Sequence, residues 1–381
     1  MTPRPVSAGA AGVRHLYVHL PFCASRCGYC DFVTLVGREG QHEAYVHALL
    51  AELALERPVL APKLESIFLG GGTPTLTAPA VLGRLLEALP PAEEVTVEAN
   101  PETVTPALAG LLSECGVTRV SVGAQSFQPR LLEVLDRRAG PDGVRRAVYA
   151  LRDANLDNIS LDLIYGIPGQ SSADLDADLT EALALRPEHI SCYELEAKPG
   201  TRFTHAHGAE LARQAEAMER YFERVVERLT GAGYRWYETA NFCRSPVAAD
   251  GRDLRSRHNL AYWRARDYLG LGIGAVSTIE SRRWRNTPRL GRYLAALGAG
   301  ERPPREVEPL PDGVRRSERV LLGLRLDEPL PLAGLDGTVD EAAIERLRRL
   351  GLIERGDGRR ELALTPRGRF LGGGVTAELL A

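Results

Sequence analysis

The sequence predicts an α/β protein in which a parallel sheet covered by helices is followed by a small second domain. Six short runs rich in β-branched and aromatic residues are each followed by a longer amphipathic run. Polar residues and glycines collect where the short runs end. The composition changes near residue 300, where the Pro-rich stretch ERPPREVEPLP indicates a linker.

The expected elements follow one another in a regular order. The strands are HLYVHL, SIFLGG, VTVEAN, RVSVGAQ, NISLDLIYG and HISCYELE. The helices that follow them are expected at 41–57, 78–89, 106–114, 129–136, 172–185 and about 210–229. Strands separated by helices in this way form a parallel sheet with right-handed crossovers. The alternation alone does not distinguish an open doubly wound sheet from a complete or partial barrel.

Polar residues at the strand ends favour the barrel, because the chemistry of such barrels gathers on one rim at the carboxyl ends of the strands. Taken singly, each of these residues is more simply a turn glycine or a satisfied polar group. Their recurrence on successive strands indicates a shared site. The residues are Gly71, Gly72, Thr73, Glu98, Asn100, Gln125, Asp162, Glu194 and Glu196.

The residues beyond the linker predict two helices and a hairpin, the pattern of a winged-helix-like domain. Such a module raises the question of DNA binding. From residue 312 to residue 370, however, twelve Arg face eleven Asp and Glu, and no basic stripe stands out. The whole chain carries a formal charge of -3. We therefore expect no nucleic-acid partner.

The composition predicts a cytoplasmic protein. No run approaches the roughly 20 apolar residues of a membrane helix, and the first dozen residues lack the apolar core of a signal peptide. We expect residues 1–13 to be disordered. Thiols stay reduced in the cytosol, so clustered cysteines there bind metal or carry redox chemistry more often than they form disulfides.

Three of the six cysteines, Cys23, Cys27 and Cys30, lie within eight positions after the first predicted strand. A loop with this spacing can surround one corner of a [4Fe-4S] cluster, whose usual fourth cysteine is absent from the motif. One iron then stays open to an exchangeable ligand. A structural zinc with His19 as fourth ligand does not fit the usual paired spacing, and a redox thiol pair leaves Cys23 unexplained.

The motif CASRCGYC, followed after the next strand by GGGTP, resembles the radical S-adenosylmethionine superfamily. Within it, YVHLPFC, FLGGGTPTL, VEANPET, SVGAQSF, LDLIYGIPGQ and YLGLGIGA resemble the oxygen-independent coproporphyrinogen III oxidase family and the related HemW group of haem chaperones. The resemblance implies a partial (β/α)6 barrel with Cys23, Cys27 and Cys30 as ligands of a [4Fe-4S] cluster. It implies that S-adenosylmethionine is surrounded by Tyr17, Tyr29, Gly71, Gly72, Thr73, Glu98, Gln125, Arg137 and Asp162.

These residue types suit the implied ligand. The two glycines that begin this set would let backbone groups approach the ligand without an intervening Cβ. Arg137 could pair with the methionyl carboxylate, and Glu98 or Asp162 could accept hydrogen bonds from ribose hydroxyls. Tyr29 offers an aromatic face to the adenine. GGGTP lacks the Gly-Lys-Ser/Thr ending of a Walker loop, so a nucleotide triphosphatase is not indicated.

Two departures from the oxidase pattern favour the HemW group. The oxidase pattern continues to a fourth cysteine where this chain has Phe32, and it carries a longer arm before the first strand. The stretch RHNLAYW, with His258, Asn259, Tyr262 and Trp263, matches the HNxxYW motif of that group, whose histidine is implicated in haem binding. A neutral imidazole is a standard axial ligand of haem iron, so we expect His258 to bind haem.

The segment around this motif is rich in arginine, which would suit two haem propionates. These residues are Arg244, Arg252, Arg255, Arg257, Arg264 and Arg266. The next candidates for the haem ligand are His205, His207 and Cys243.

We therefore expect a haem chaperone that binds haem, a [4Fe-4S] cluster and S-adenosylmethionine, and that transfers haem to an acceptor protein of unknown identity. The acceptor could bring the chaperone transiently to a membrane. We do not expect coproporphyrinogen oxidase activity, although a radical enzyme that decarboxylates coproporphyrinogen III is the alternative. The expected domains are the barrel at 14–240, an extension with the HNxxYW motif at 241–300, and the linker with the winged-helix-like domain at 301–381.

Overall fold

The chain folds around one nine-stranded sheet with the strand order β11-β1-β4-β5-β6-β7-β8-β10-β9. The computed structural model describes residues 12–196, 202–244, 251–356 and 360–380, so most of the predicted disordered N-terminus lies outside the described residues. The strands from β11 to β8 are parallel, and β10 and β9 complete the sheet in antiparallel pairs. The strands are β1 (His15–Leu20), β4 (Leu64–Gly71), β5 (Ala92–Ala99), β6 (Arg119–Gln125), β7 (Ile159–Tyr165), β8 (His189–Glu194), β9 (Tyr234–Glu238), β10 (Asn241–Arg244) and β11 (Leu269–Leu271).

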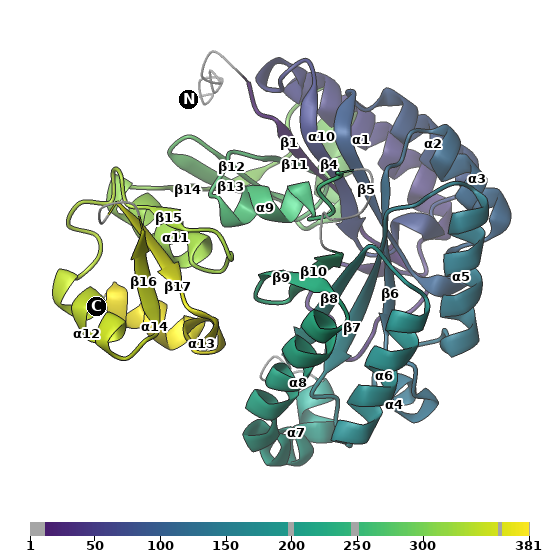
Figure 1. Ribbon diagram of the computed structural model, residues 1–381. Helices are drawn as coiled ribbons and strands as arrows, with labels where there is room; N and C mark the ends of the chain where they lie inside the picture. The colour runs from purple at the N-terminus through teal and green to yellow at the C-terminus, as the bar shows by residue number, and fades with distance from the viewer. Residues whose placement is uncertain (1–11, 197–201, 245–250, 357–359, 381) are drawn as a thin grey trace.

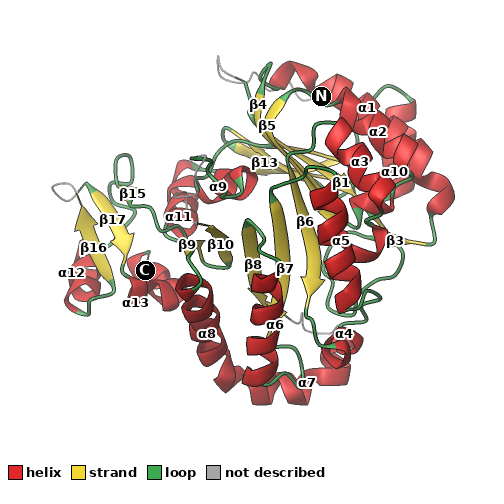
Figure 2. Ribbon diagram, turned by 45° about the vertical axis from the view of Figure 1, so that its right-hand side comes forward, coloured by secondary structure: helices red, strands yellow, loops and turns green. Residues whose placement is uncertain are grey.

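Helices cover the convex side of this curved sheet (Figures 1 and 2). They are α1 (His42–Glu56), α2 (Pro79–Ala88), α3 (Pro106–Glu114), α4 (Pro129–Val134), α5 (Pro141–Asp153), α6 (Ser172–Ala184), α7 (Arg202–Gln214) and α8 (Met218–Gly231). The predicted α/β fold with its six strand–helix units is confirmed, and α5 is a helix that the sequence reasoning missed. Among the described residues, no helix combines the length and the apolar composition that a membrane span requires.

Each parallel strand has one apolar face and one polar face. In β1, Leu16, Val18 and Leu20 are fully buried in the main core, which they share with side chains of the outer helices. The residues between them are polar, and the same alternation recurs along the sheet because side chains point to opposite faces with a period of two. The register places Thr96 opposite Arg119. The polar side chains therefore share the concave face of the sheet.

Residues after β10 cover part of the concave face and extend the sheet. The helix α9 (Arg257–Trp263) lies against β4, and Glu94 of β5 accepts hydrogen bonds from the first two backbone N–H groups of α9. A separate antiparallel sheet and one helix follow. These elements are β12 (Val276–Ile279), β13 (Arg282–Asn286), α10 (Leu290–Gly298) and β14 (Arg305–Pro309). The last of these strands lies inside the stretch that the sequence analysis expected to be a linker. These residues form a strand because they pair along their whole length with β13.

The C-terminal module has a hydrophobic core of its own and lies beside β9 and β10 (Figure 1). The predicted two helices and hairpin are present, with a third short strand and two further helices. The elements are α11 (Asp312–Gly323), β15 (Leu330–Pro331), α12 (Glu341–Arg349), β16 (Ile353–Gly356), β17 (Glu361–Leu364), α13 (Pro366–Phe370) and α14 (Gly372–Leu379). The Arg369 guanidinium stacks 3.6 Å from the Trp236 ring centroid, and Arg325 pairs with the buried Glu238 at 2.7 Å. The expected domain boundaries remain a prediction.

Glu52 on α1 connects the barrel to the segment after β11. Its fully buried carboxylate accepts hydrogen bonds from the Gly272 N–H (2.8 Å), the Tyr293 hydroxyl (2.6 Å) and the Asn286 amide (2.7 Å). Burial raises the pKa of Glu52 to about 7, although these hydrogen bonds and Arg305 oppose the shift. The carboxyl group therefore ionises within the neutral range while it holds two parts of the chain together.

Replacing Glu52 with Gln should flatten the pH dependence of stability between about pH 4.5 and pH 7. Because the pKa of Glu52 is higher in the folded chain, the folded state binds this proton more tightly. Glu52 therefore favours folding most at low pH and loses roughly 3 kcal/mol of that contribution as the pH rises through the window. Urea unfolding at pH 5 and pH 7.5 measures the difference. Glu43→Gln on the exposed face of α1 is the control, and an unchanged pH dependence in Glu52→Gln would contradict the assignment.

Candidate functional site: a cysteine loop and a polar sheet face

The three clustered cysteines lie on a loop at the carboxyl end of β1. Cys23 ends the short strand β2 (Phe22–Cys23), which pairs with β3 (Leu35–Val36), and the Cys30 N–H donates to the Cys27 carbonyl at 3.2 Å. All three thiols are partly exposed. Burial raises the pKa of the Cys23 thiol, and Cys30 and Cys27 also contribute to the shift. The loop thus brings the predicted ligands close to one another.

A chain of side-chain contacts connects two of these thiols across the rim. The Thr73 hydroxyl donates to Cys23 Sγ at 3.7 Å and accepts from the Asn100 amide at 3.0 Å. Arg137 donates to the Asn100 carbonyl oxygen at 2.8 Å and to Cys27 Sγ at 3.7 Å. The strand ends of β4 and β5 and the loop after α4 therefore support one thiol loop. The sequence reasoning placed Asn100 on the rim but did not include it among the site residues.

These residues fit an iron–sulfur cluster better than a zinc ion. His19, the proposed fourth zinc ligand, has a partner at both ring nitrogens: the Tyr17 hydroxyl at 2.9 Å from Nδ1 and the Val33 carbonyl oxygen at 2.8 Å from Nε2. Within the part of the chain that the structure describes, no three His, Cys, Asp or Glu side chains form a group that could hold a single metal ion. Three thiolates around a cubane bind three different irons, so they need not converge on one point.

The GGGTP loop needs its glycines for a reason that the sequence did not indicate. Gly71 has φ +110°, and a Cβ there would lie 2.4 Å from the His19 ring. A Cβ on Gly72 would lie 2.5 Å from the carbonyl carbon of Pro21. The missing side chains therefore make room for the end of β1 and the start of the cysteine loop. The expectation that they also let backbone groups approach a ligand stays a prediction.

Two carboxyl groups of the predicted nucleotide site lie on the concave face, near the rim. Glu98 accepts a hydrogen bond from the Gly71 N–H at 3.1 Å, and Asp162 accepts from the Ser121 hydroxyl at 3.0 Å. Burial, with a further contribution from the charge of Asp162, raises the pKa of Glu98 to about 7. Burial also raises the pKa of Asp162. Both groups can therefore accept hydrogen bonds from a polar ligand without carrying two full charges at neutral pH.

The remaining predicted nucleotide residues surround the same rim. Tyr29 lies near Cys27 and Arg137 and packs edge-on against Phe203 of α7, with ring centroids 6.4 Å apart. Gln125 ends β6 with φ +65°, where the register with β7 shifts. Tyr17 lies one layer lower, beside Phe68 on the concave face.

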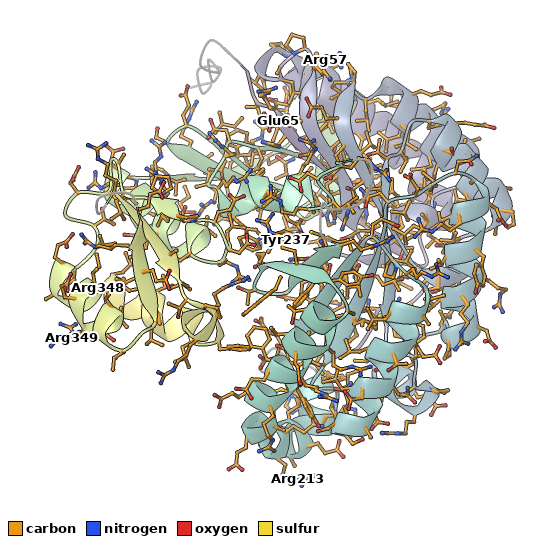
Figure 3. The ribbon with its side chains drawn as sticks, viewed as in Figure 1. Arg57, Glu65, Arg213, Tyr237, Arg348 and Arg349 are labelled. Atoms are coloured by element: carbon orange, nitrogen blue, oxygen red, sulfur yellow. The ribbon has the colours of Figure 1, made fainter. Side chains whose placement is uncertain are left out.

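The concave face also holds a deeper polar group that the sequence reasoning missed. His189 lies between the Ser160 hydroxyl at 2.9 Å and the Tyr237 hydroxyl at 2.8 Å. Tyr237 belongs to β9, the edge strand of the sheet on the side of the C-terminal module (Figure 3). Arg119 of β6 is only 2% exposed, and its charge contributes to the lowered pKa of His189. The alternation of polar and apolar residues in strands such as RVSVGAQ was the signal, since strands buried on both faces are usually continuously apolar.

His258 of the HNxxYW motif lies inside this polar group and is 2% exposed. Its Nδ1 is 3.1 Å from the Ser66 hydroxyl, and its Nε2 is 3.2 Å from the Tyr262 hydroxyl. The ring stacks on Phe68 at 5.1 Å between centroids. Burial lowers the pKa of His258 to about 3, so the imidazole is neutral. Iron can reach this ring only after one of the two polar contacts breaks.

The arginines expected to hold haem propionates mostly have carboxylate partners at the surface. This leaves them poorly suited to the expected role, because a propionate would have to displace a protein carboxylate. The pairs are Arg244 with Glu188 (3.7 Å), Arg255 with Asp253 (2.6 Å) and with Glu328, Arg257 with Glu93 (3.2 Å), and Arg264 with Glu328 (2.8 Å).

Of the other candidate haem ligands, Cys243 packs in a hydrophobic cluster with Leu260 of α9, whereas the two histidines lie on α7. Cys243 of β10 is 1% exposed, and burial raises its pKa to about 12. His205 is exposed on α7, where His207 is half-buried and lies 3.4 Å from the Glu210 carboxylate.

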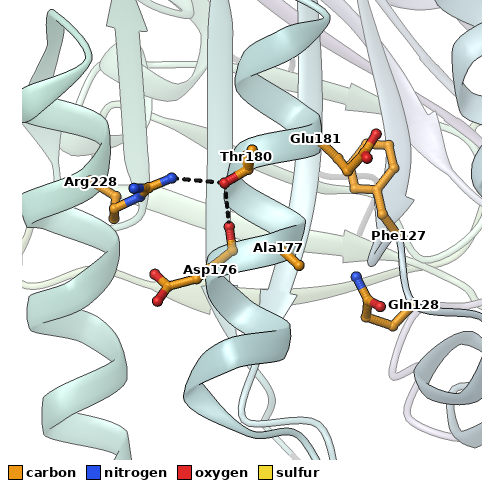
Figure 4. A pocket seen from close by; sticks show the side chains of 7 residues that line it. All are labelled: Phe127, Gln128, Asp176, Ala177, Thr180, Glu181 and Arg228. Atoms are coloured by element: carbon orange, nitrogen blue, oxygen red, sulfur yellow. Dashed lines mark hydrogen bonds between the residues drawn. The ribbon is translucent and has the colours of Figure 1, made fainter.

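A pocket in the outer layer of the fold contains none of the predicted site residues. It lies at α6 and α8, where Arg228 donates to the Thr180 hydroxyl at 2.8 Å (Figure 4). Its lining residues are Phe127, Gln128, Asp176, Ala177, Thr180, Glu181 and Arg228. The candidate site is therefore the rim and the concave face.

The cysteine loop and the parallel sheet define a radical S-adenosylmethionine protein, and residues 17–182 match the Radical SAM superfamily. The heme chaperone HemW of Mycobacterium tuberculosis H37Rv is 36% identical over 96% of this chain and 94% of its own length. HemW of Bacillus subtilis is 30% identical over 97% of this chain and 99% of its own length. The chain belongs to the HemW family.

The fold also resembles a solved enzyme structure. The coproporphyrinogen III oxidase HemN of Escherichia coli superimposes with a TM-score of 0.80, covering 97% of this chain and 91% of the enzyme. The two sequences are 20% identical. The likeness confirms the predicted architecture.

Replacing Cys23, Cys27 and Cys30 together with Ala should abolish the iron–sulfur absorbance of anaerobically reconstituted protein, because no thiolates would remain to bind the irons. Wild-type protein should bind about four irons and four sulfides. Iron and sulfide analysis with visible spectroscopy measures both. Cys115→Ala, which changes a thiol on the helical side of the fold, should retain the cluster. Stoichiometric zinc in place of a reconstitutable cluster would contradict the assignment.

Proposed function

We propose that the protein is a cytoplasmic haem chaperone that binds haem, a [4Fe-4S] cluster and S-adenosylmethionine, and passes haem to an acceptor protein. The observation that carries the proposal is the 36% identity to the Mycobacterium tuberculosis heme chaperone HemW, which extends over 96% of this chain. The proposed acceptor is unidentified, and any contact with a membrane would be transient and made through that acceptor.

The rim supplies the groups that the proposed cofactors require. Cys23, Cys27 and Cys30 would hold the cluster, which when bound supplies one iron open to an exchangeable ligand. Arg137 can still donate to Cys27 when that sulfur is a ligand, and charged donors of this kind stabilise thiolates. Glu98 and the residues beside it would orient S-adenosylmethionine through hydrogen bonds.

The alternative is an oxygen-independent coproporphyrinogen III oxidase. The fold likeness to HemN favours it, but at 20% identity that likeness concerns architecture alone. Phe32 stands where the oxidase pattern has its fourth cysteine, and its side chain is 64% exposed. A phenyl ring cannot replace a thiolate in any role, so this position supports the chaperone.

Reconstituted wild-type protein should bind haem and should not convert coproporphyrinogen III to protoporphyrinogen IX. No oxidase activity is expected because the chain has no thiolate at position 32. Haem binding is expected because α9 places His258 on the concave face. An anaerobic haem titration, followed by visible spectroscopy, runs beside a turnover assay with S-adenosylmethionine and a reductant. Decarboxylation with multiple turnovers would establish the oxidase instead, and failure to bind haem would reject the chaperone.

We propose that His258 is the haem ligand and that its contact with the Tyr262 hydroxyl breaks when haem binds. A neutral imidazole has one N–H and one lone pair. If Ser66 accepts from Nδ1–H, the lone pair on Nε2 accepts the Tyr262 hydroxyl and becomes available when that side chain turns away. Ser66 would then orient the ring, as hydrogen-bond partners of iron-bound histidines commonly do.

Replacing His258 with Ala should weaken haem binding at least tenfold and change the haem absorbance spectrum, whereas Tyr262→Phe should bind haem at least as tightly as wild type. The Phe variant keeps the aromatic packing and removes the hydroxyl that competes for the lone pair. Haem titration gives both affinities, and cluster content should stay unchanged. An unaltered spectrum in His258→Ala would exclude His258 and make His207 the next residue to replace.

A further inference from the structure

Arg119 is the buried cation of the concave face that lacks a direct partner. It is 2% exposed, and its guanidinium Nε has no hydrogen-bond partner. Within the described part of the chain, Arg119 forms neither a side-chain hydrogen bond nor an ion pair within 4.0 Å. Buried charges are normally paired or fully hydrogen-bonded, because removing them from water is costly. An arginine in this condition is suited to an anionic partner from outside the chain.

The carboxylates near Arg119 are engaged elsewhere. Glu94 accepts the backbone N–H groups of Arg257 and His258 at the start of α9. Asp162 accepts the hydroxyl of Ser121, and Glu98 accepts the Gly71 N–H. Burial raises the pKa of each of these groups and the charge of Arg119 opposes that shift, but Arg119 bonds to none of them. Its five N–H donors therefore remain for a ligand with carboxylate-type acceptors.

Arg119 lies one layer below the carboxyl groups near the rim. The register places Ser121 opposite Glu98, and Arg119 stands two residues earlier in β6. At about 3.3 Å per residue, Arg119 is therefore roughly 7 Å deeper along the strands than Glu98. A methionyl group at the cysteine loop would use carboxylate partners near the rim, such as Arg137. A ligand of Arg119 would have to reach below Glu98 on the concave face.

Aromatic side chains lie at the same level of the sheet as Arg119, because the register aligns Tyr17 with Phe68, Phe68 with Thr96, and Thr96 with Arg119. Tyr17 and Phe68 lie one beside the other, with ring centroids 6.3 Å apart, and Phe68 stacks on His258. Tyr193 of β8 is 42% exposed although it belongs to a central strand of the sheet. Aromatic side chains beside a buried guanidinium match a ligand with a flat apolar body and carboxylate ends.

We propose that Arg119 binds a propionate carboxylate of haem on the concave face of the sheet. The inference rests on the proposed function, because it assumes that haem is the ligand. It places the propionate beside His258, whose neutral ring lies close enough to Arg119 for the two to interact electrostatically. The guanidinium pairs with the carboxylate in the two-point geometry that arginine favours.

The test compares haem with haem dimethyl ester, which has the same ring and iron but no free carboxylate. Wild-type protein should bind haem roughly 30-fold more tightly than the ester, as expected for the loss of one buried charge pair. In Arg119→Gln this preference should fall to less than threefold, and Arg119→Lys should retain part of it. Arg228→Gln, in the outer helical layer, is the matched control and should retain the full preference.

Four outcomes decide the matter. Equal affinity of wild-type protein for haem and the ester would overturn the inference without any variant, while haem binding itself would leave the chaperone proposal standing. Failure of wild-type protein to bind haem would reject both. A full preference in a folded Arg119→Gln variant, with unchanged cluster content, would overturn the assignment to this residue. A loss of S-adenosylmethionine binding in Arg119→Gln, with the ester preference intact, would overturn it in favour of the methionyl carboxylate.

Discussion

Buried polar groups need partners, and this constraint organises the polar face of the sheet. A parallel sheet covered by helices on one side normally buries both faces in apolar contacts. Here one face presents histidines, serines and carboxylates, and nearly every one is tied to a neighbour: His189 to Ser160 and Tyr237, Glu94 to the start of α9. The helix α9 is thereby part of the polar interior. Its position follows from hydrogen bonds as much as from apolar packing.

The same constraint explains the rim. A loop with three thiols has little apolar surface with which to fix its shape, so the surrounding strands fix it with polar contacts. Thr73 and Arg137 each reach a thiol, and Asn100 joins the two. Networks of this kind specify one geometry, since removing any member leaves another group unsatisfied. The cysteine loop and the sheet therefore depend on each other.

The sequence was sufficient for the fold and for placing the three cysteines together on one loop, because strand periodicity and thiol spacing are local signals. It was insufficient for the partners of those residues. The arginines near His258 looked available in sequence, but neighbours such as Glu93, 164 residues from Arg257, pair with them in space. Gly72 was singled out as a place where a ligand approaches, and the steric reason for its missing side chain is the backbone of Pro21, which only the folded structure brings near. Arg119 was missed because nothing in RVSVGAQ shows that its guanidinium lacks a partner.

The C-terminal module covers the edge strand β9 of the main sheet. An open sheet exposes a row of backbone donors and acceptors at each end, and such edges tend to pair with other chains. Here the residues after α11 occupy this edge: the Asp327 N–H donates to the Tyr237 carbonyl, and Glu238 forms a bridge with Leu326. The C-terminal module thus acts as a cover for the sheet. A chain that ended before this module would keep every cysteine and every concave-face residue, but it would expose the backbone donors and acceptors of β9 to pairing with other chains.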